Sequence, residues 1–340
     1  DISISQITFT GSAPSFERAT FYGVTATAYY PADDATWTED VRQNYVGTIT
    51  WVPYEEAPAT SGICGDNLTW NYGDGLLTIS GTGAMADYEV PNGSEYDSPW
   101  YRYASEITAA VVEEGVTTIG EDAFYWCENL TEVTLPSTLV SIGHNAFGYC
   151  SIAEVELPDG LITLGGFKNN PITEVVIPDS VTTIDDNAFT ECKELTSVVL
   201  PSSLEYLGTR AFSSCVNLSQ IVMPQMPNFQ SFGMMGSYFS GCAFTDLDWY
   251  TLSEIGYQMF VANNFVELEI PECVTIVNDF AFEGCDSMTK VTVPASVTYL
   301  GSVSFGSCTA LEEVYFLGDA PELGADLVQR LTDVTFYYPA

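Results

Sequence analysis

Apolar and small residues recur along most of the chain at a spacing of about 23 residues. The repeated phrase is clearest at 188–208, where it reads AFTECKELTSVVLPSSLEYLG. It returns at Ala211-Phe212, and it occurs earlier at Ala146-Phe147 and Ala123-Phe124. Self-similarity at a fixed period of roughly 20–50 residues indicates stacked repeats. One unit cannot bury its own apolar row, so the core must form between neighbouring units.

Each part of the unit predicts a local structure. Val198 and Leu200 alternate with Ser197 and Val199, which predicts a short strand with one row facing inward and one outward. Pro201 has no N–H and ends that strand. Gly208 then occupies a slot whose residue types tolerate positive φ, so we expect a left-handed turn there. The other occupants of the slot are Gly120, Gly143, Gly301, Asp185 and Asn278.

The proline slot sets a register of ten units. Its occupants are Glu113, Pro136, Pro158, Pro178, Pro201, Pro224, Tyr250, Pro271, Pro294 and Leu317. The period and the leucine/Cys-or-Asn pattern are those of a leucine-rich-repeat solenoid. The predicted fold is a repeat solenoid of about ten units of ~23 residues, with a parallel sheet on one face and β-rich caps at both ends.

The two ends of the chain resemble each other. Residues 7–14 (ITFTGSAP) echo residues 314–321 (VYFLGDAP), and the YYPA of 29–32 returns at 337–340. We expect a β-rich closing segment of a preceding repeat array at 1–56, an N-terminal β cap at 57–106, the solenoid at 107–317 and the start of a truncated C-terminal cap at 318–340. The chain would then be part of a longer protein; the alternative is a chance similarity between two β-rich caps.

Seven of the nine cysteines lie three residues after the repeat Phe. They are Cys127, Cys150, Cys192, Cys215, Cys242, Cys285 and Cys308, and two units have Asn170 and Asn263 in the same slot. A slot that accepts Cys or Asn favours a small side chain that hydrogen-bonds a buried turn. We therefore expect a column of reduced structural thiols, although spacing alone leaves disulfides and a metal as alternatives. Cys64 and Cys273 lie outside this column, and their redox state is open.

The charge is strongly acidic, with 46 Asp and Glu against 8 Lys and Arg and a net charge of −38. Nucleic acid is excluded as a partner because phosphate contacts need Lys and Arg. No apolar run reaches the ~18 residues of a membrane span, so we expect no membrane insertion within this chain. We expect any export signal or anchor to lie outside it.

No catalytic constellation is apparent. His144 is the only histidine, and its slot varies between units, which argues against a Ser-His-Asp site and against a His-ligated metal. No phosphate-binding glycine motif or calcium loop is present. The pair of carboxylates that glycoside hydrolysis needs cannot be identified by counting in so acidic a chain. We expect no enzymatic activity, no cofactor and no metal.

The caps carry a family resemblance. Residues 61–70 (SGICGDNLTW), 77–85 (LTISGTGAM), Pro99-Trp100 and 115–120 (GVTTIG), together with the repeat, closely resemble the BspA-like leucine-rich-repeat surface proteins of bacteria. The resemblance covers nearly the whole chain. It implies a large exported protein on the extracellular side of the bacterial cell surface, with adhesion to host or neighbouring-cell proteins for some members. It supplies no catalytic residues.

The outward rows of the predicted sheet are the candidate binding surface. They combine carboxylates with apolar valines, and like charges on adjacent strands do not help the fold. The residues are Glu132, Glu154, Glu156, Glu174, Val176, Val199, Val222, Asp246, Asp248, Glu267, Glu269, Glu313 and Tyr315.

The hypothesis is a non-catalytic adhesion module whose acidic face binds a surface or matrix protein of a host or neighbouring cell. A basic protein suits that face, and a glycan is the other possible partner. The alternative is a passive structural spacer within a large surface protein.

Overall fold

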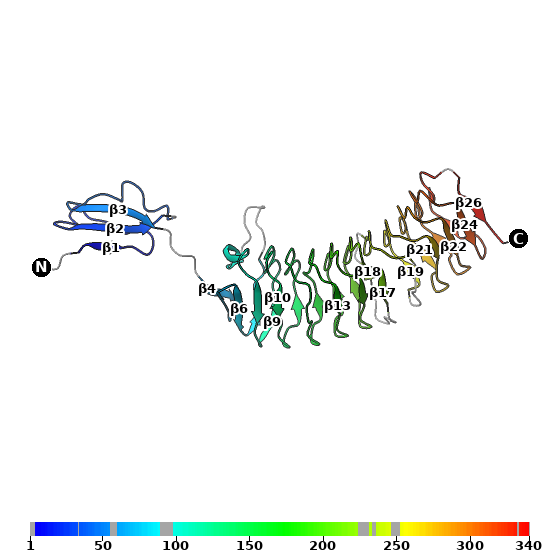
Figure 1. The fold of residues 1–340 in the computed structure, drawn as a ribbon, viewed down its shortest axis with the longest axis horizontal. Coiled ribbons are helices and arrows are strands. Elements are labelled where there is room, and N and C mark those ends of the chain that lie inside the picture. The colour runs from blue at the N-terminus through cyan, green and yellow to red at the C-terminus, as the bar shows by residue number, and fades with distance from the viewer. Residues whose placement is uncertain are drawn as a thin grey trace. The chain divides into compact units, whose positions relative to one another are not determined.

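The computed structural model describes residues 4–32, 34–54, 60–88, 98–223, 231–232, 236–245, 252–331 and 333–339. The chain forms two compact units, Asp1–Ala59 and Thr60–Ala340 (Figure 1).

The first unit is a small parallel sheet. Its strands are β1 (Gln6–Thr8), β2 (Thr25–Pro31) and β3 (Thr48–Tyr54), in the order β1-β2-β3. Phe21, Ala26, Ala28 and Ile49 are buried together. The register pairs Thr8 with Tyr29, and the same register recurs near the other end of the chain, where Tyr315 pairs with Tyr337. That the first unit closes a preceding array stays a prediction.

The second unit begins with three antiparallel strands joined as hairpins, within the range predicted as the N-terminal β cap. Strands β4 (Ser61–Gly65), β5 (Leu68–Gly73) and β6 (Leu76–Gly81) pair antiparallel, and β6 then pairs in parallel with β8 (Ala109–Val112). The hairpin therefore joins the repeat sheet directly and covers its first strand. Behind it, Trp100 is fully buried and precedes the 3₁₀ helix η2 (Tyr101–Tyr103).

From β6 onward the second unit is a solenoid with two parallel faces. The first face carries the strands that the sequence predicts: β8, β10 (Glu132–Thr134), β13 (Glu174–Val176), β15 (Ser197–Val199), β17 (Gln220–Val222), β20 (Glu267–Glu269), β22 (Lys290–Val293), β24 (Glu313–Phe316) and β26 (Thr335–Tyr337). We call its outward side the acidic face. The parallel row extends past the ten predicted units, through β6 at one end and β26 at the other.

The second face carries two parallel sheets of very short strands, one from β7 to β18 and one from β19 to β25, which the repeat pattern did not predict. They are β7 (Gly83–Ala84), β9 (Val116–Ile119), β11 (Ser141–Ile142), β12 (Thr163–Leu164), β14 (Thr183–Ile184), β16 (Tyr206–Leu207), β18 (Ser231–Phe232), β19 (Glu254–Ile255), β21 (Ile276–Val277), β23 (Tyr299–Leu300) and β25 (Glu322–Leu323). The second residue of most of these strands points into the core. Leu207, the residue before Gly208, is buried in this way.

The prediction of a left-handed turn at Gly208 is wrong. Positive φ occurs instead two and six residues later, at Arg210 (57°) and Ser214 (61°). The reason for glycine is space, because a Cβ at Gly208 would lie 2.3 Å from the backbone of Asp185 in the preceding turn. Residue type alone could not distinguish a need for positive φ from a need for space, since glycine satisfies both.

The repeat Phe packs on the third side of each turn. Nine Phe rings stack from Phe124 to Phe305, with centroids 4.9–6.0 Å apart and interplanar angles of 4–18°. Trp100 begins the column, 5.6 Å from Phe124. Each Phe also bonds through its backbone to the next turn, as in Phe189 N–H to the carbonyl of Ala211 at 2.7 Å. We call this the Phe ladder.

The cysteine column caps the Phe ladder, and all nine cysteines are free thiols. The Cys215 thiol donates to the carbonyl of Phe189 in the preceding turn at 3.1 Å, and five other column cysteines repeat this bond at 3.2–3.3 Å. Asn170 makes the equivalent bond from Nδ2 to the Phe147 carbonyl at 2.7 Å. The expectation of a reduced, hydrogen-bonded column is confirmed.

Both asparagines of the column follow a short turn that begins at a cysteine. The turn Cys150-Ser151-Ile152 lacks one residue of the usual Cys-x-x-Leu, and the Ile152 N–H donates to Oδ1 of Asn170 at 3.0 Å. The Phe244 N–H reaches Oδ1 of Asn263 in the same way. In a full-length turn the corresponding N–H is already used, since Leu195 N–H donates to the Cys192 carbonyl. Cys and Asn therefore are not interchangeable here.

Removing one ring from the Phe ladder should be costly. We expect Phe212→Ala to lower the free energy of unfolding by about 3–5 kcal/mol, because the ring is fully buried between Phe189 and Phe239. Val216→Ala, in the same turn but 50% exposed, is the matched control and should change it little. Urea unfolding followed by circular dichroism measures both. Equal, small effects would show that the repeat Phe does not hold the turns together.

Exchange within the cysteine column should be harmful in both directions. Cys215→Asn would bury an amide oxygen without a donor, and Asn170→Cys would leave the Ile152 N–H without an acceptor. Each should cost about 1–3 kcal/mol of folding stability. The same urea titration measures this, with Cys215→Ala separating loss of the thiol from addition of the amide. Wild-type stability in Cys215→Asn would contradict the role assigned to the short turn.

Candidate functional site

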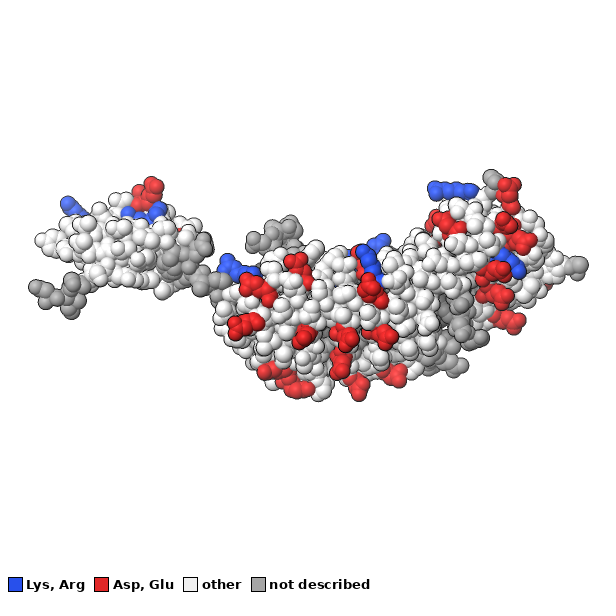
Figure 2. All heavy atoms as spheres, in the orientation of Figure 1, with Lys and Arg blue, Asp and Glu red and all other residues white. Residues whose placement is uncertain are grey.

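The predicted outward rows do lie on the surface. Glu132, Glu154, Glu156 and Glu174 are exposed, and Figure 2 shows carboxylates distributed along the solenoid with few Lys or Arg among them. The parallel register places Glu174, Ser197 and Gln220 side by side. Asp246 and Asp248 lie outside the described residues.

Three valines form an apolar stripe within the acidic face. Val176, Val199 and Val222 are paired by register on β13, β15 and β17, and their side chains are 81%, 52% and 54% exposed. The inward residues between them, such as Val198, are buried. An exposed apolar row flanked by charge is a feature of surfaces that bind partners.

Several charged side chains in the later part of the acidic face have partners within the molecule. Lys290 lies 3.8 Å from Glu267 and 5.2 Å above the ring of Tyr315. Tyr315 and Tyr337 stack at 4.3 Å, and both hydroxyls donate to the Glu313 carboxylate. Burial, and then the Glu313 carboxylate, raise the pKa of Tyr315. Glu313 and Tyr315 are therefore engaged within the molecule.

The sheet of the acidic face opens near its beginning. Strand β10 is the last strand of its sheet and β13 is the first of the next, and residues 154–156 between them form no strand. Ser151 N–H still bonds to Leu130, and Thr173 N–H to Ala153. Within the described range 98–223, no backbone hydrogen bond then joins 154–157 to either neighbour.

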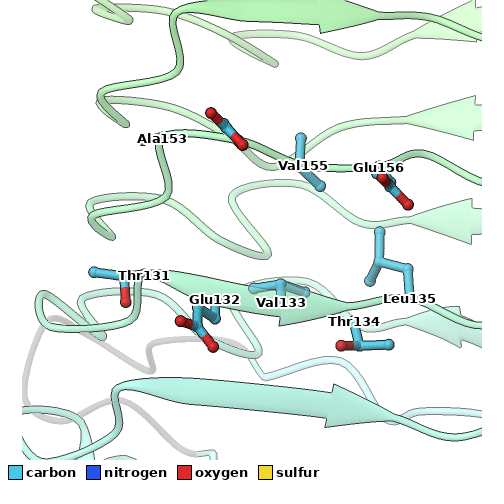
Figure 3. Close-up of a pocket in the computed structure, with 9 residues that line it drawn as sticks. Thr131, Glu132, Val133, Thr134, Leu135, Ala153, Val155 and Glu156 are labelled. Atoms are coloured by element: carbon cyan, nitrogen blue, oxygen red, sulfur yellow. The ribbon is translucent and has the colours of Figure 1, made fainter.

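A groove of about 520 Å³ occupies this opening (Figure 3). One wall is residues 131–135 and the other is residues 153–156. Val133, Val155 and Leu135 supply apolar surface, while Glu132, Glu154 and Glu156 supply carboxylates. The lining contains no Lys or Arg. We call it the acidic groove. Its volume is within the range typical of ligand sites.

The opening has two causes in the sequence. The spacing from Glu132 to Glu154 is 22 residues and from Glu154 to Glu174 is 20, against 23 from Glu174 to Ser197, so the middle segment is held by shortened turns. Three glutamates would also stand opposite one another in a closed sheet. Each such pair costs only about 0.7 kcal/mol at ~6 Å in water, so this repulsion is the smaller of the two contributions. The rows were predicted, whereas the groove was missed; the irregular spacing was its signal.

Other chemistry has little support. His144 Nδ1 is 3.9 Å from Asp185 on a half-exposed surface. Among the described residues, no group of three or more His, Cys, Asp or Glu could hold a metal. No described helix is both long and apolar enough to cross a bilayer. Burial raises the pKa of Cys127, Cys192 and Cys242 to about 12, so these thiols stay protonated and are poor nucleophiles.

Comparison with known proteins places this geometry in a family. The model of the BspA type leucine rich repeat region matches in six copies, at residues 97–166, 162–242 and 234–335. The chain belongs to the BspA-type leucine-rich-repeat family. Proteins of this family are typically bacterial surface proteins, and the family suggests a surface repeat module of the protein-binding or adhesion type.

Two solved structures share the fold. A leucine-rich repeat protein from Bacteroides ovatus is 22% identical with a TM-score of 0.56, covering 81% of this chain and 78% of its own. Another from Eubacterium ventriosum is 24% identical with a TM-score of 0.52, covering 79% and 75%. No curated protein matches the chain.

The buried thiols predict alkaline sensitivity. Above the ordinary cysteine pKa of 9.0 the unfolded chain loses thiol protons that the BspA-type repeats retain, so unfolding releases protons and is favoured as pH rises. Stability should be constant just below about pH 9 and fall by up to about 1.4 kcal/mol per pH unit for each such thiol above it. Urea midpoints at about pH 8 and about pH 10 test this; Cys192→Ala should reduce the fall. An unchanged midpoint would contradict it.

Proposed function

We propose that this chain is a non-catalytic adhesion module and that its acidic groove holds an extended, basic segment of a partner protein. The observation that carries the proposal is the interruption of the sheet at 154–156, where an apolar floor and three carboxylates meet open strand edges. The proposal makes the acidic face a specific binding surface and not only a solubilising one.

The open edges suit strand addition. β10 is hydrogen-bonded to β8 on one side only, and β13 to β15 on one side only. An edge strand presents free N–H and C=O groups to which an extended peptide can bond. Side chains that alternate along the added strand would meet the valine floor on one side and the carboxylates on the other.

Charge selects the partner. Glu132, Glu154 and Glu156 form no ion pair and no side-chain hydrogen bond within the described part of the chain, in contrast to Glu267 and Glu313 farther along. Unpaired carboxylates attract Lys and Arg and raise the association rate at low salt. The valine stripe starts in the next turn and extends the surface that a larger partner would cover.

Family membership supports an extracellular place of action. BspA-type proteins are typically found at the bacterial surface, so the partner we propose is a surface or matrix protein of a host or neighbouring cell. A glycan at the acidic groove has less support, since the groove offers acceptors without donor side chains apart from Thr131 and Thr134.

The proposal is tested with a designed probe: a fluorescent peptide in which Lys alternates with Val. We expect it to bind the full chain, and Glu132→Gln, Glu154→Gln and Glu156→Gln together to weaken binding by about tenfold or more, mainly through slower association. Fluorescence anisotropy and stopped-flow mixing at low and high salt measure affinity and rate. Peptides methylated at alternate backbone nitrogens should bind poorly, because they cannot complete the strand ladder.

The control variant removes the same charge elsewhere. Glu113→Gln, Asp159→Asn and Glu194→Gln lie at exposed positions outside the acidic groove and should leave peptide binding unchanged. Equal losses of peptide binding in the two triple variants would show that the interaction depends only on the overall negative charge of the chain. No binding by any basic peptide would favour the passive spacer.

A further inference from the structure

In the described turns from Trp126 onward, a left-handed residue immediately precedes the Cys or Asn column or, in the last turn, Leu331. Its φ lies between 52° and 71° throughout the described turns. From the third turn onward the occupants are Asn169, Glu191, Ser214, Gly241, Ala262, Gly284, Ser307 and Arg330. The first two turns have Trp126 (61°) and Tyr149 (58°) instead. Bulky residues are uncommon in this conformation because of steric strain, although Phe280 and Val303 also adopt it in later turns.

The two strained aromatics form one stack. The rings of Trp126 and Tyr149 are 4.7 Å apart and inclined by only 2°. Lys168 lies 5.2 Å above the Tyr149 ring, and Tyr125 meets Tyr149 edge-on at 5.4 Å. Tyr149 is therefore occupied by neighbours, whereas Trp126 remains 43% exposed. The stack holds the indole rigidly at the surface, which lowers the entropy cost of binding to it.

The exposed indole borders a second groove, of about 480 Å³. Its other lining residues come from η2 and the turns beside it: Tyr101, Arg102, Ala104, Ser105 and Glu128. Arg102 and Glu128 are exposed, and no ion pair joins them in the described structure. The groove thus offers one cationic donor, one anionic acceptor and a serine hydroxyl around an aromatic surface.

We propose that this aromatic groove binds a neutral sugar ring, stacked on the indole of Trp126. A pyranose presents C–H groups on one face, and their slight positive charge matches the negative face of an aromatic ring. Its hydroxyls both donate and accept, so they can use Glu128 and Arg102 together. A ligand with charge of one sign would match only one of these two groups. The aromatic groove shares no residue with the acidic groove, so the inference does not depend on the proposed protein partner.

Glycine substitution separates binding from folding. In Trp126→Gly the loss of the ring stack is offset by relief of left-handed strain, as Gly241 and Gly284 occupy the same slot. We expect near-normal thermal unfolding but about tenfold weaker or no sugar binding. Ser214→Gly makes the same backbone change in a later turn and is the matched control. Glu128→Gln tests the polar side of the groove.

The probes are neutral soluble polysaccharides, namely a β-glucan, a galactomannan and a xylan, with polygalacturonate as an anionic comparison. Affinity electrophoresis of the full chain should show retardation by at least one neutral polysaccharide. Trp126→Gly should abolish it, and Ser214→Gly and the Glu132/Glu154/Glu156 triple variant should preserve it. Retardation by none of them, retardation by polygalacturonate alone, or normal retardation of Trp126→Gly would each overturn the proposal. So would a Trp126→Gly chain that loses only the basic peptide, since the indole would then belong to a protein site.

Discussion

The contact between successive turns at the repeat Phe is the interaction on which the rest of the solenoid depends. At this contact each Phe ring stacks on the Phe ring of the next turn, and the backbone N–H of the Phe donates to a carbonyl of that turn. The carbonyl of the Phe accepts a hydrogen bond from the column Cys or Asn of the following turn. Each turn therefore touches only its neighbours, and stability is a sum of such interfaces. The hairpin and Trp100 begin this series, where the first turn would otherwise expose its apolar side.

Because the ladder fixes the interior, the outward positions of each turn are free to vary. Both candidate sites arise where early turns depart from the regular pattern. Shortened turns around Cys150 and Asn170 open the sheet, and aromatic residues in the left-handed slot create a rigid exposed stack. The turns from β20 onward are more regular, and there the Glu313 carboxylate is bound by neighbouring side chains.

The strong negative charge affects function more than folding. Adjacent exposed carboxylates repel weakly in water and salt screens them further, so the ladder tolerates them. At the acidic groove the same charges meet free strand edges and apolar side chains, and it is there that we propose they select basic segments. One property, acidity, therefore has different consequences at different turns.

The sequence by itself determined the solenoid and the sides of its strands. A repeated Ala-Phe, a Cys-or-Asn slot and an alternating strand define a turn, and stacking follows because no turn buries its own core. It also placed Glu132, Glu154 and the three valines outward, since side chains alternate along a strand. Only the tertiary structure decided which neighbours pair. Spacings of 22 and 20 residues are compatible with a closed or an open sheet, and the choice depends on the short turns and on charge across the gap. Gly208 was assigned the wrong role because residue type reports small size and positive φ alike, and only backbone geometry separates them. Trp126 and Tyr149 are 23 residues apart, so their adjacency was implicit in the register, but the left-handed backbone beneath them was not.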